Sequence, residues 1–281
     1  MSKTIKISYV ALVVSIVGLL ATTVYANHAW GKYHWNLSTQ DTIDNPLKLG
    51  NNLTSVDWDS SLNLAAVDWN QSVIKNQIVA GAGQTNCDPV LGQVEVCNGE
   101  YGNNGWLGIA QIWTYRGKEA HIAQAVTMMN DTYFNLPQYN TSAWKNMVMC
   151  QEVGHTFGLA HQDEDFYNLN LGSCMDYTSD PTGILGTNGT LNNERPNQHD
   201  YDELQLIYAH LNDTTSGGSK PGKGSGGKKR LGSTTVNPAE WGQAIAQDAQ
   251  GKNSVYVRNL DNGMQLITHV LWVPGEEQDH H

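Results

Sequence analysis

The most informative segment of the chain reads Cys150-Gln151-Glu152-Val153-Gly154-His155-Thr156-Phe157-Gly158-Leu159-Ala160-His161. Residues four apart lie on the same face of a helix, so Gln151 and His155 are expected to project together, with Glu152 beside them. Gly158 can adopt the left-handed conformation that ends a helix. The chain then turns back, and His161 can approach from a different direction. This arrangement supplies three metal ligands, a fourth position open to water, and a carboxylate base beside that position.

This segment resembles the extended zinc signature of the metzincins, a class of zinc metalloproteases, in which H-E-x-x-H-x-x-G-x-x-H precedes a turn around a methionine. The sequence Ser173-Cys174-Met175-Asp176-Tyr177 is similar to that Met-turn. The resemblance covers residues 27–213 in order and size, and it points to a matrixin- or astacin-like catalytic domain. It implies that Met175 forms a hydrophobic floor beneath the metal. It also implies that Tyr177 ligates the metal or stabilises the oxyanion.

The resemblance implies one catalytic Zn²⁺ held by Gln151, His155 and His161, with Glu152 as the general base. The sequence departs from the signature at Gln151, because a glutamine oxygen is neutral and a poorer donor than an imidazole. Three outcomes are open: Gln151 binds zinc, the site is silenced, or another residue supplies the third ligand. The remaining histidines are expected to be ordinary surface or core residues; those considered are His28, His34, His121, His199, His210 and His269.

The expected fold class is α+β. The resemblance implies a twisted mixed five-stranded sheet with an active-site helix, a Met-turn and a C-terminal helix. Residue patterns predict helices at 58–72, 143–159 and 200–211, and strands at 33–35, 73–80 and 105–114. In the family, the strand matching 105–114 is the edge strand above the cleft, where an extended peptide pairs by main-chain hydrogen bonds. The alternative for this segment is an inner strand of the core.

Four regions are predicted along the chain. Residues 1–26 form a signal peptide, 27–213 a metzincin-like catalytic domain, and 214–235 a linker rich in Gly, Ser and Lys. Residues 236–281 form a small β-rich C-terminal tail. Within this tail, 255–258 and 265–273 suggest a hairpin around Asp261-Asn262-Gly263.

The first residues indicate export. Lys3 and Lys6 precede an apolar run over 7–24, and Val24-Tyr25-Ala26 predicts cleavage after Ala26. The expected location is therefore extracellular, with no stable membrane insertion after cleavage. The alternative is an uncleaved signal anchor, because the apolar run is close to the minimum length that spans a bilayer.

The four cysteines suggest two disulfides in an exported chain. Three pairings of Cys87, Cys97, Cys150 and Cys174 are possible in principle. A bond between Cys87 and Cys97 would close a short loop and leave Cys150 with Cys174. The latter bond would tie the metal-bearing helix to the Met-turn. A four-cysteine zinc site is poorly supported, because the sequence contains no C-x-x-C pair.

A formal net charge of −11 argues against nucleic acid as a partner, because phosphate binding requires basic patches. The resemblance to metzincins, together with the export signal, implies a secreted, monomeric zinc metalloendopeptidase with polypeptide substrates. The alternative is a catalytically silenced metzincin scaffold that acts as an extracellular binding protein. The run Asp163-Glu164-Asp165 could form a Ca²⁺ site, although a solvated acidic loop is the favoured interpretation.

Overall fold

The computed structural model describes residues 28, 33–37, 44–83, 86–117, 120–212, 232–261 and 263–275. The predicted signal peptide and most of the predicted linker lie outside the described residues. In the part of the chain that is described, no helix is long and apolar enough to cross a membrane.

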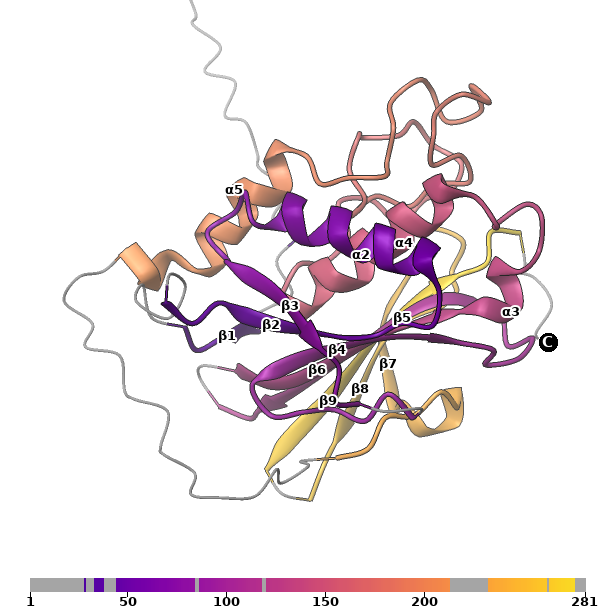
Figure 1. Cartoon of the computed structure of the whole chain (residues 1–281). Helices are drawn as coiled ribbons and strands as arrows, with labels where there is room; N and C mark the ends of the chain where they lie inside the picture. The colour runs from indigo at the N-terminus through magenta and orange to yellow at the C-terminus, as the bar shows by residue number, and fades with distance from the viewer. Residues whose placement is uncertain are drawn as a thin grey trace, which may run out of the picture.

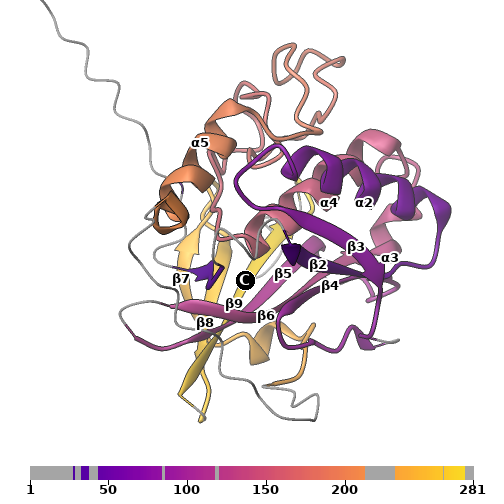
Figure 2. The ribbon, with the colours of Figure 1, turned by 60° about the vertical axis from the view of Figure 1, so that its left-hand side comes forward.

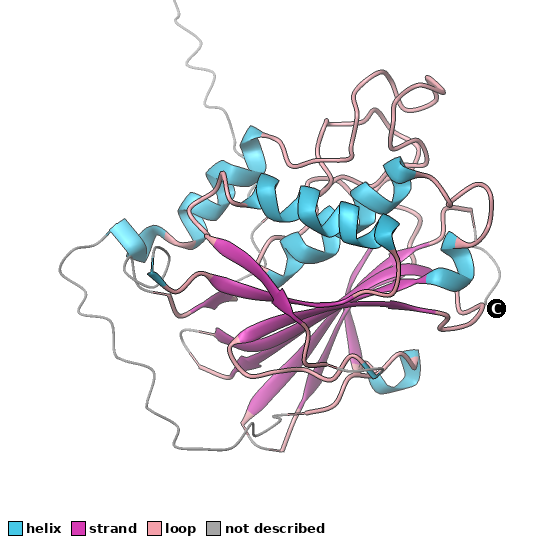
Figure 3. Ribbon diagram, in the orientation of Figure 1, coloured by secondary structure: helices cyan, strands magenta, loops and turns pink. Residues whose placement is uncertain are grey.

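Within the described residues, one twisted mixed sheet of nine strands runs through the protein (Figure 3). Its order is β3-β2-β4-β6-β5-β9-β8-β7, and β1 also pairs with β6. The strands are β1 (His34–Trp35), β2 (Leu47–Asn52), β3 (Asn76–Ala80), β4 (Gln93–Gly99), β5 (Trp106–Tyr115), β6 (His121–Asn130), β7 (Gln243–Gln247), β8 (Asn253–Asn259) and β9 (Met264–Trp272).

The sheet has a parallel and an antiparallel part. Strands β1, β2, β3, β4 and β6 pair in parallel, whereas β5, β9, β8 and β7 pair in antiparallel fashion. The expected number of five strands is too low. Strands β4 and β6 are buried almost throughout, so they lack the alternation of buried and exposed residues that marks a strand in sequence. The C-terminal segment adds three further strands.

The helices gather on one face of the sheet, as Figures 1 and 2 show from two directions. They are α2 (Val56–Trp69), α4 (Ser142–Thr156) and α5 (Gln198–Ile207), with the short α3 (Asp131–Phe134) after β6. The 3₁₀ turn η2 (Ala209–Asn212) follows α5, and η3 (Pro238–Glu240) precedes β7. The three helices predicted from the sequence are confirmed, with ends shifted by a few residues.

Side-chain caps fix where α4 and α5 begin. The Thr141 hydroxyl accepts a hydrogen bond from the backbone N–H of Trp144 and caps α4. At α5, Asn197 and Asp200 form a reciprocal capping box. These caps satisfy backbone donors that would otherwise be left without partners at the helix ends.

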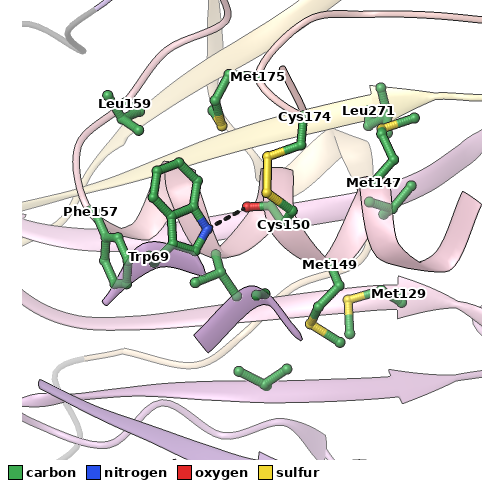
Figure 4. Close-up of a cluster of buried hydrophobic side chains, with 14 of the residues drawn as sticks. Trp69, Met129, Met147, Met149, Cys150, Phe157, Leu159, Cys174, Met175 and Leu271 are labelled. Carbon is green, nitrogen blue, oxygen red and sulfur yellow. Dashed lines mark hydrogen bonds between the residues drawn. A yellow bond between two sulfur atoms is a disulfide. The ribbon is translucent and has the colours of Figure 1, made fainter. Parts of the chain in front are cut away.

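Helix α4 is buried between the sheet and α2. Trp69, at the end of α2, is fully buried and donates a hydrogen bond from Nε1 to the Cys150 carbonyl, at 3.1 Å. Figure 4 shows this contact beside the disulfide between Cys150 and Cys174 and close to Met175. Through Cys150, α4 is thus joined to both α2 and the loop around Met175.

The structure contains two disulfides, Cys87 with Cys97 and Cys150 with Cys174. This is the pairing in which the first bond closes a short loop. No free cysteine remains among the described residues. Two disulfides fit an extracellular protein, since such bonds persist in oxidising compartments.

Strand β5 is not an edge strand. It lies between β6 and β9, with Ala110 paired to Thr127 on one side and to His269 on the other. The expectation of an edge strand at 105–114 is therefore wrong for this structure, and the alternative of an inner strand holds. The reason is distant in sequence: β9 belongs to the C-terminal segment and covers the side of β5 that would otherwise be free.

The predicted C-terminal hairpin is confirmed as β8 and β9, with Leu260 donating its backbone N–H to the Met264 carbonyl. Its strands continue the sheet formed by residues 34–130. Val273 also donates its N–H to the carbonyl of Gly105, directly before β5. The segment 236–275 therefore shares a sheet and a core with the preceding region.

Candidate metal centre

Three histidines from three separate segments meet on the face of the sheet that α4 covers. His155 comes from α4, His161 from the loop after it, and His269 from β9; one ring nitrogen of each lies within 4.8 Å of the others. All three are buried. The His155 ring stacks on His269 at 3.9 Å between centroids and meets the His161 ring edge-on at 4.5 Å.

The turn after α4 brings His161 back to the helix. Gly158 has a φ of +102°, a left-handed conformation that a side chain would strain. A Cβ at this position would also collide with the carbonyl oxygen of Tyr33. The predicted role of Gly158 in ending the helix is confirmed, and it explains how His161 reaches His155.

Hydrogen bonds orient two of the rings. The Nδ1–H of His155 donates to the Leu159 carbonyl at 2.8 Å, since a carbonyl oxygen can only accept. His161 Nδ1 lies 2.7 Å from Oε1 of Glu164 and donates to that carboxylate. In both rings Nε2 is then the nitrogen left to bind a metal, as in metal sites where a carbonyl or carboxylate holds the outer nitrogen.

Burial also keeps the site in its ligand form. Desolvation lowers the pKa of His155 well below its usual value, with a smaller contribution from the nearby His161. The pKa of His269 is lowered well below its usual value for the same main reason. Neutral imidazoles bind metals and protonated ones do not, so burial favours the ligand form.

Glu152 lies against the sheet, one residue along from the predicted ligand Gln151. Its side chain is fully buried, and its carboxyl fills the space beside Gly108 of β5, where a Cβ would collide with it. Burial raises the pKa of Glu152 well above its usual value. Neither carboxyl oxygen has a hydrogen-bond partner among the described residues. A buried carboxyl of raised pKa suits a group that accepts a proton near neutral pH.

Gln151 is turned toward the loop around Met175. Its Nε2 donates to the Cys174 carbonyl at 2.9 Å, while Oε1 has no hydrogen-bond partner within the described part of the chain. The structure thus brings His155 and His161 together, whereas the Glu152 carboxyl lies beside Gly108 of β5. The amide nitrogen of Gln151 is used to hold the neighbouring loop.

The turn at 173–177 packs under the helix. Met175 is fully buried, and its Sδ would collide with a Cβ at Gly154, so helix and turn meet closely. The Tyr177 ring lies 4.4 Å from that of His161, and its hydroxyl donates to the Val270 carbonyl at 3.2 Å. Tyr177 therefore reaches the metal-ligand cluster and strand β9 together, and burial raises its pKa well above the usual value.

Sequence reasoning did not place His269 in the site. Val270, its neighbour in β9, lies 93 residues from Tyr177 in sequence, so no local spacing links the two segments. One feature of the sequence could have indicated it. Ile267, His269 and Leu271 are two residues apart, so all three lie on the same buried face of a strand. A histidine among apolar residues on such a face is a candidate for binding.

A second group of His28, His199 and Asp200 also has ligand atoms within 4.8 Å of one another. Its carboxylate is already engaged, because Asp200 accepts hydrogen bonds from Gln162, Ser173 and the Asn197 backbone. These contacts anchor the start of α5.

The residues considered for Ca²⁺ belong to neither metal-capable group among the described residues. Glu164 instead binds His161. Asp163 accepts hydrogen bonds from the Asp165 backbone and from Asn168, as in a hydrogen-bonded loop.

Asp176 gives a prediction for pH. It is fully buried, and desolvation raises its pKa to about 7 from 3.8. The folded state holds the Asp176 proton more tightly than the unfolded state does. The contribution of this group to the free energy of unfolding is therefore complete below the unfolded pKa and is lost as pH rises toward and above 7. Asp176→Asn should remove a pH-dependent loss of about 4 kcal/mol between pH 4 and 8. Urea unfolding at several pH values measures it; a wild-type curve that stays flat would contradict the prediction.

No protein-family model matches the chain, and no curated protein matches it. One solved structure that it resembles is that of myroilysin, with a TM-score of 0.31 and 12% sequence identity. The alignment covers 60% of this chain and 83% of that chain. A likeness this weak leaves the geometry of the site to carry the functional argument.

Proposed function

We propose that the chain is a zinc-dependent metalloendopeptidase of the metzincin type, secreted and acting on polypeptides. The observation that supports this most directly is the cluster of three buried imidazoles, with the buried carboxyl of Glu152 three residues before His155 on the same helix. His155 and His161 belong to the sequence signature, and each has its Nδ1 held by an oxygen. Imidazole nitrogens oriented in this way are the donor set that zinc prefers in catalytic sites.

Zinc would polarise the scissile carbonyl and lower the pKa of a bound water. Glu152 would take the proton from that water, because its pKa is raised by burial and it lies three residues before His155 on α4. Tyr177 would donate its hydroxyl to an oxyanion. Its hydroxyl already donates to a peptide carbonyl, that of Val270.

Access to the site depends on β9. This strand pairs with β5 along its length, and Glu152 is buried beneath the pair at Gly108. In this structure β9 therefore occupies the side of β5 along which an extended peptide would otherwise pair.

His155→Ala tests the metal assignment. We expect the variant to lose its zinc, because two of the clustered nitrogens cannot hold the ion as three do. His210→Ala is the matched control, since His210 is outside both metal-capable groups and contacts the carbonyl of Leu37.

Elemental analysis of the purified chain gives zinc per molecule, and a chelator should abolish peptide cleavage that added zinc restores. About one zinc in the wild type and the control, with none in His155→Ala, supports the proposal. Equal zinc contents in all three proteins would contradict it.

A second candidate function is an extracellular binding protein on a silenced scaffold of the same kind. The closed site favours it, since the imidazoles and Glu152 are all buried. Zinc-loaded protein that cleaves none of a diverse set of unfolded polypeptides would support this function over hydrolysis.

A further inference from the structure

Strand geometry directs His269 toward α4. Side chains alternate between the faces of a strand, so His269 shares a face with Ile267 and Leu271. These two belong to the core that includes α4, whereas Leu266 and Val270 pack in the other core, on the far face of the sheet. His269 is thus a buried polar residue on a face whose apolar neighbours pack in the core that includes α4.

The opposite strand leaves room for this imidazole. Ala110 of β5 is directly paired with His269, and Gly108 is the next residue on that face. Small side chains at both positions open a space in the sheet surface, which the His269 ring and the Glu152 carboxyl occupy. Burying an imidazole here has a desolvation cost that a bound metal would offset.

The residue expected in this position is engaged elsewhere. Gln151 donates its amide N–H to Cys174, whose sulfur is bonded to Cys150 on the same helix. The side chain therefore braces the loop around Met175 against α4. An imidazole at 151 is absent, and His269 brings one to the same cluster from the opposite side.

The C-terminal segment is held against the loop that carries His161. Ala249 donates its N–H to the Glu164 carbonyl at 3.0 Å, and the Ser254 hydroxyl lies 3.5 Å from Oε2 of Glu164. Tyr177 bonds to Val270, next to His269. These contacts tie β8 and β9 to the carboxylate that orients His161 and to the turn beneath the metal position.

We propose that His269 is the third metal ligand, in place of the missing imidazole at residue 151, and that Gln151 is a supporting residue. The metal centre is then His155, His161 and His269, contributed by α4, its following loop and the C-terminal strand. This inference rests on the proposed metal of the site but not on peptide hydrolysis.

The test measures zinc affinity in the full chain by competition with a chromophoric chelator. His269→Ala and His269→Phe should each weaken zinc binding by at least about a hundredfold. This exceeds the loss expected when a residue that only orients a ligand is replaced. His269→Phe keeps an aromatic ring against His155 and guards against simple loss of folding, which circular dichroism checks. Gln151→Ala should weaken binding less than either His269 variant, because Gln151 supports the loop around Met175 and is not a ligand, whereas His210→Ala should change the affinity by less than about threefold.

X-ray absorption of the zinc-loaded protein counts imidazoles independently of activity. We expect three in the wild type and two in His269→Phe. Weakening by Gln151→Ala with no change in either His269 variant would overturn the proposal. Three imidazoles and a hundredfold loss in the His269 variants, without any peptide cleavage, would support this inference and argue against the proposed peptidase function.

Discussion

Replacing Glu152 with glutamine is expected to lower peptide cleavage by at least about a hundredfold, because a carboxamide of nearly the same shape cannot take a proton from water. Zinc content should stay unchanged, since Glu152 is not one of the three residues that form the metal-capable cluster. Burial raises the pKa of Glu152 and so makes its carboxylate a stronger base. The measurement is the initial rate of cleavage of a quenched fluorescent peptide by the zinc-loaded full chain.

Glu240→Gln is the matched control for this experiment. Glu240 is exposed in η3, far along the chain from the site, and should leave the rate unchanged. If Glu152→Gln cleaved as fast as the wild type, the proton would have to go to another group, and the role given to Glu152 would be wrong.

Trp69→Ala should produce the largest loss of stability, about 3–5 kcal/mol in the free energy of unfolding. The indole is fully buried and packs edge-on against Phe157 at 5.9 Å and Tyr201 at 6.2 Å. Its removal leaves a cavity directly under Gly154 and leaves the Cys150 carbonyl without its donor. Urea unfolding followed by circular dichroism provides the measurement.

Trp69→Phe separates packing from hydrogen bonding. It keeps an aromatic ring but removes the indole N–H, so a smaller loss of about 1–2 kcal/mol is expected. A loss below about 1 kcal/mol in Trp69→Ala would show that the cavity collapses and that the Trp69 contact does not support α4.

The sequence was most informative where structure depends on neighbours in the chain. The span of α4 follows from its pattern and its cap at Thr141, and its end follows from Gly158. The turn around Met175 and the disulfide from Cys150 to Cys174 also lie within a short stretch. In each case the relevant partner is close in sequence, so spacing and residue type are enough.

Long-range pairing explains what the sequence could not provide. Whether β5 is an edge or an inner strand depends on β9, which joins it from the far end of the chain. The inclusion of His269 depends on the same pairing. Strand β4 is buried on both faces, so its side chains carry no alternating pattern that would reveal it.

The placement of β9 also bears on the order in which the protein matures. His155 and His161 precede Tyr177 in the chain, and His269 is next to Val270, which follows Tyr177 by 93 positions. His155 and His161 therefore leave the ribosome well before the strand that carries His269. A nascent chain without β9 would offer a metal only two of the three clustered imidazoles. Metal acquisition would then follow completion of the sheet, and a chain cut short before β9 would remain an apoprotein.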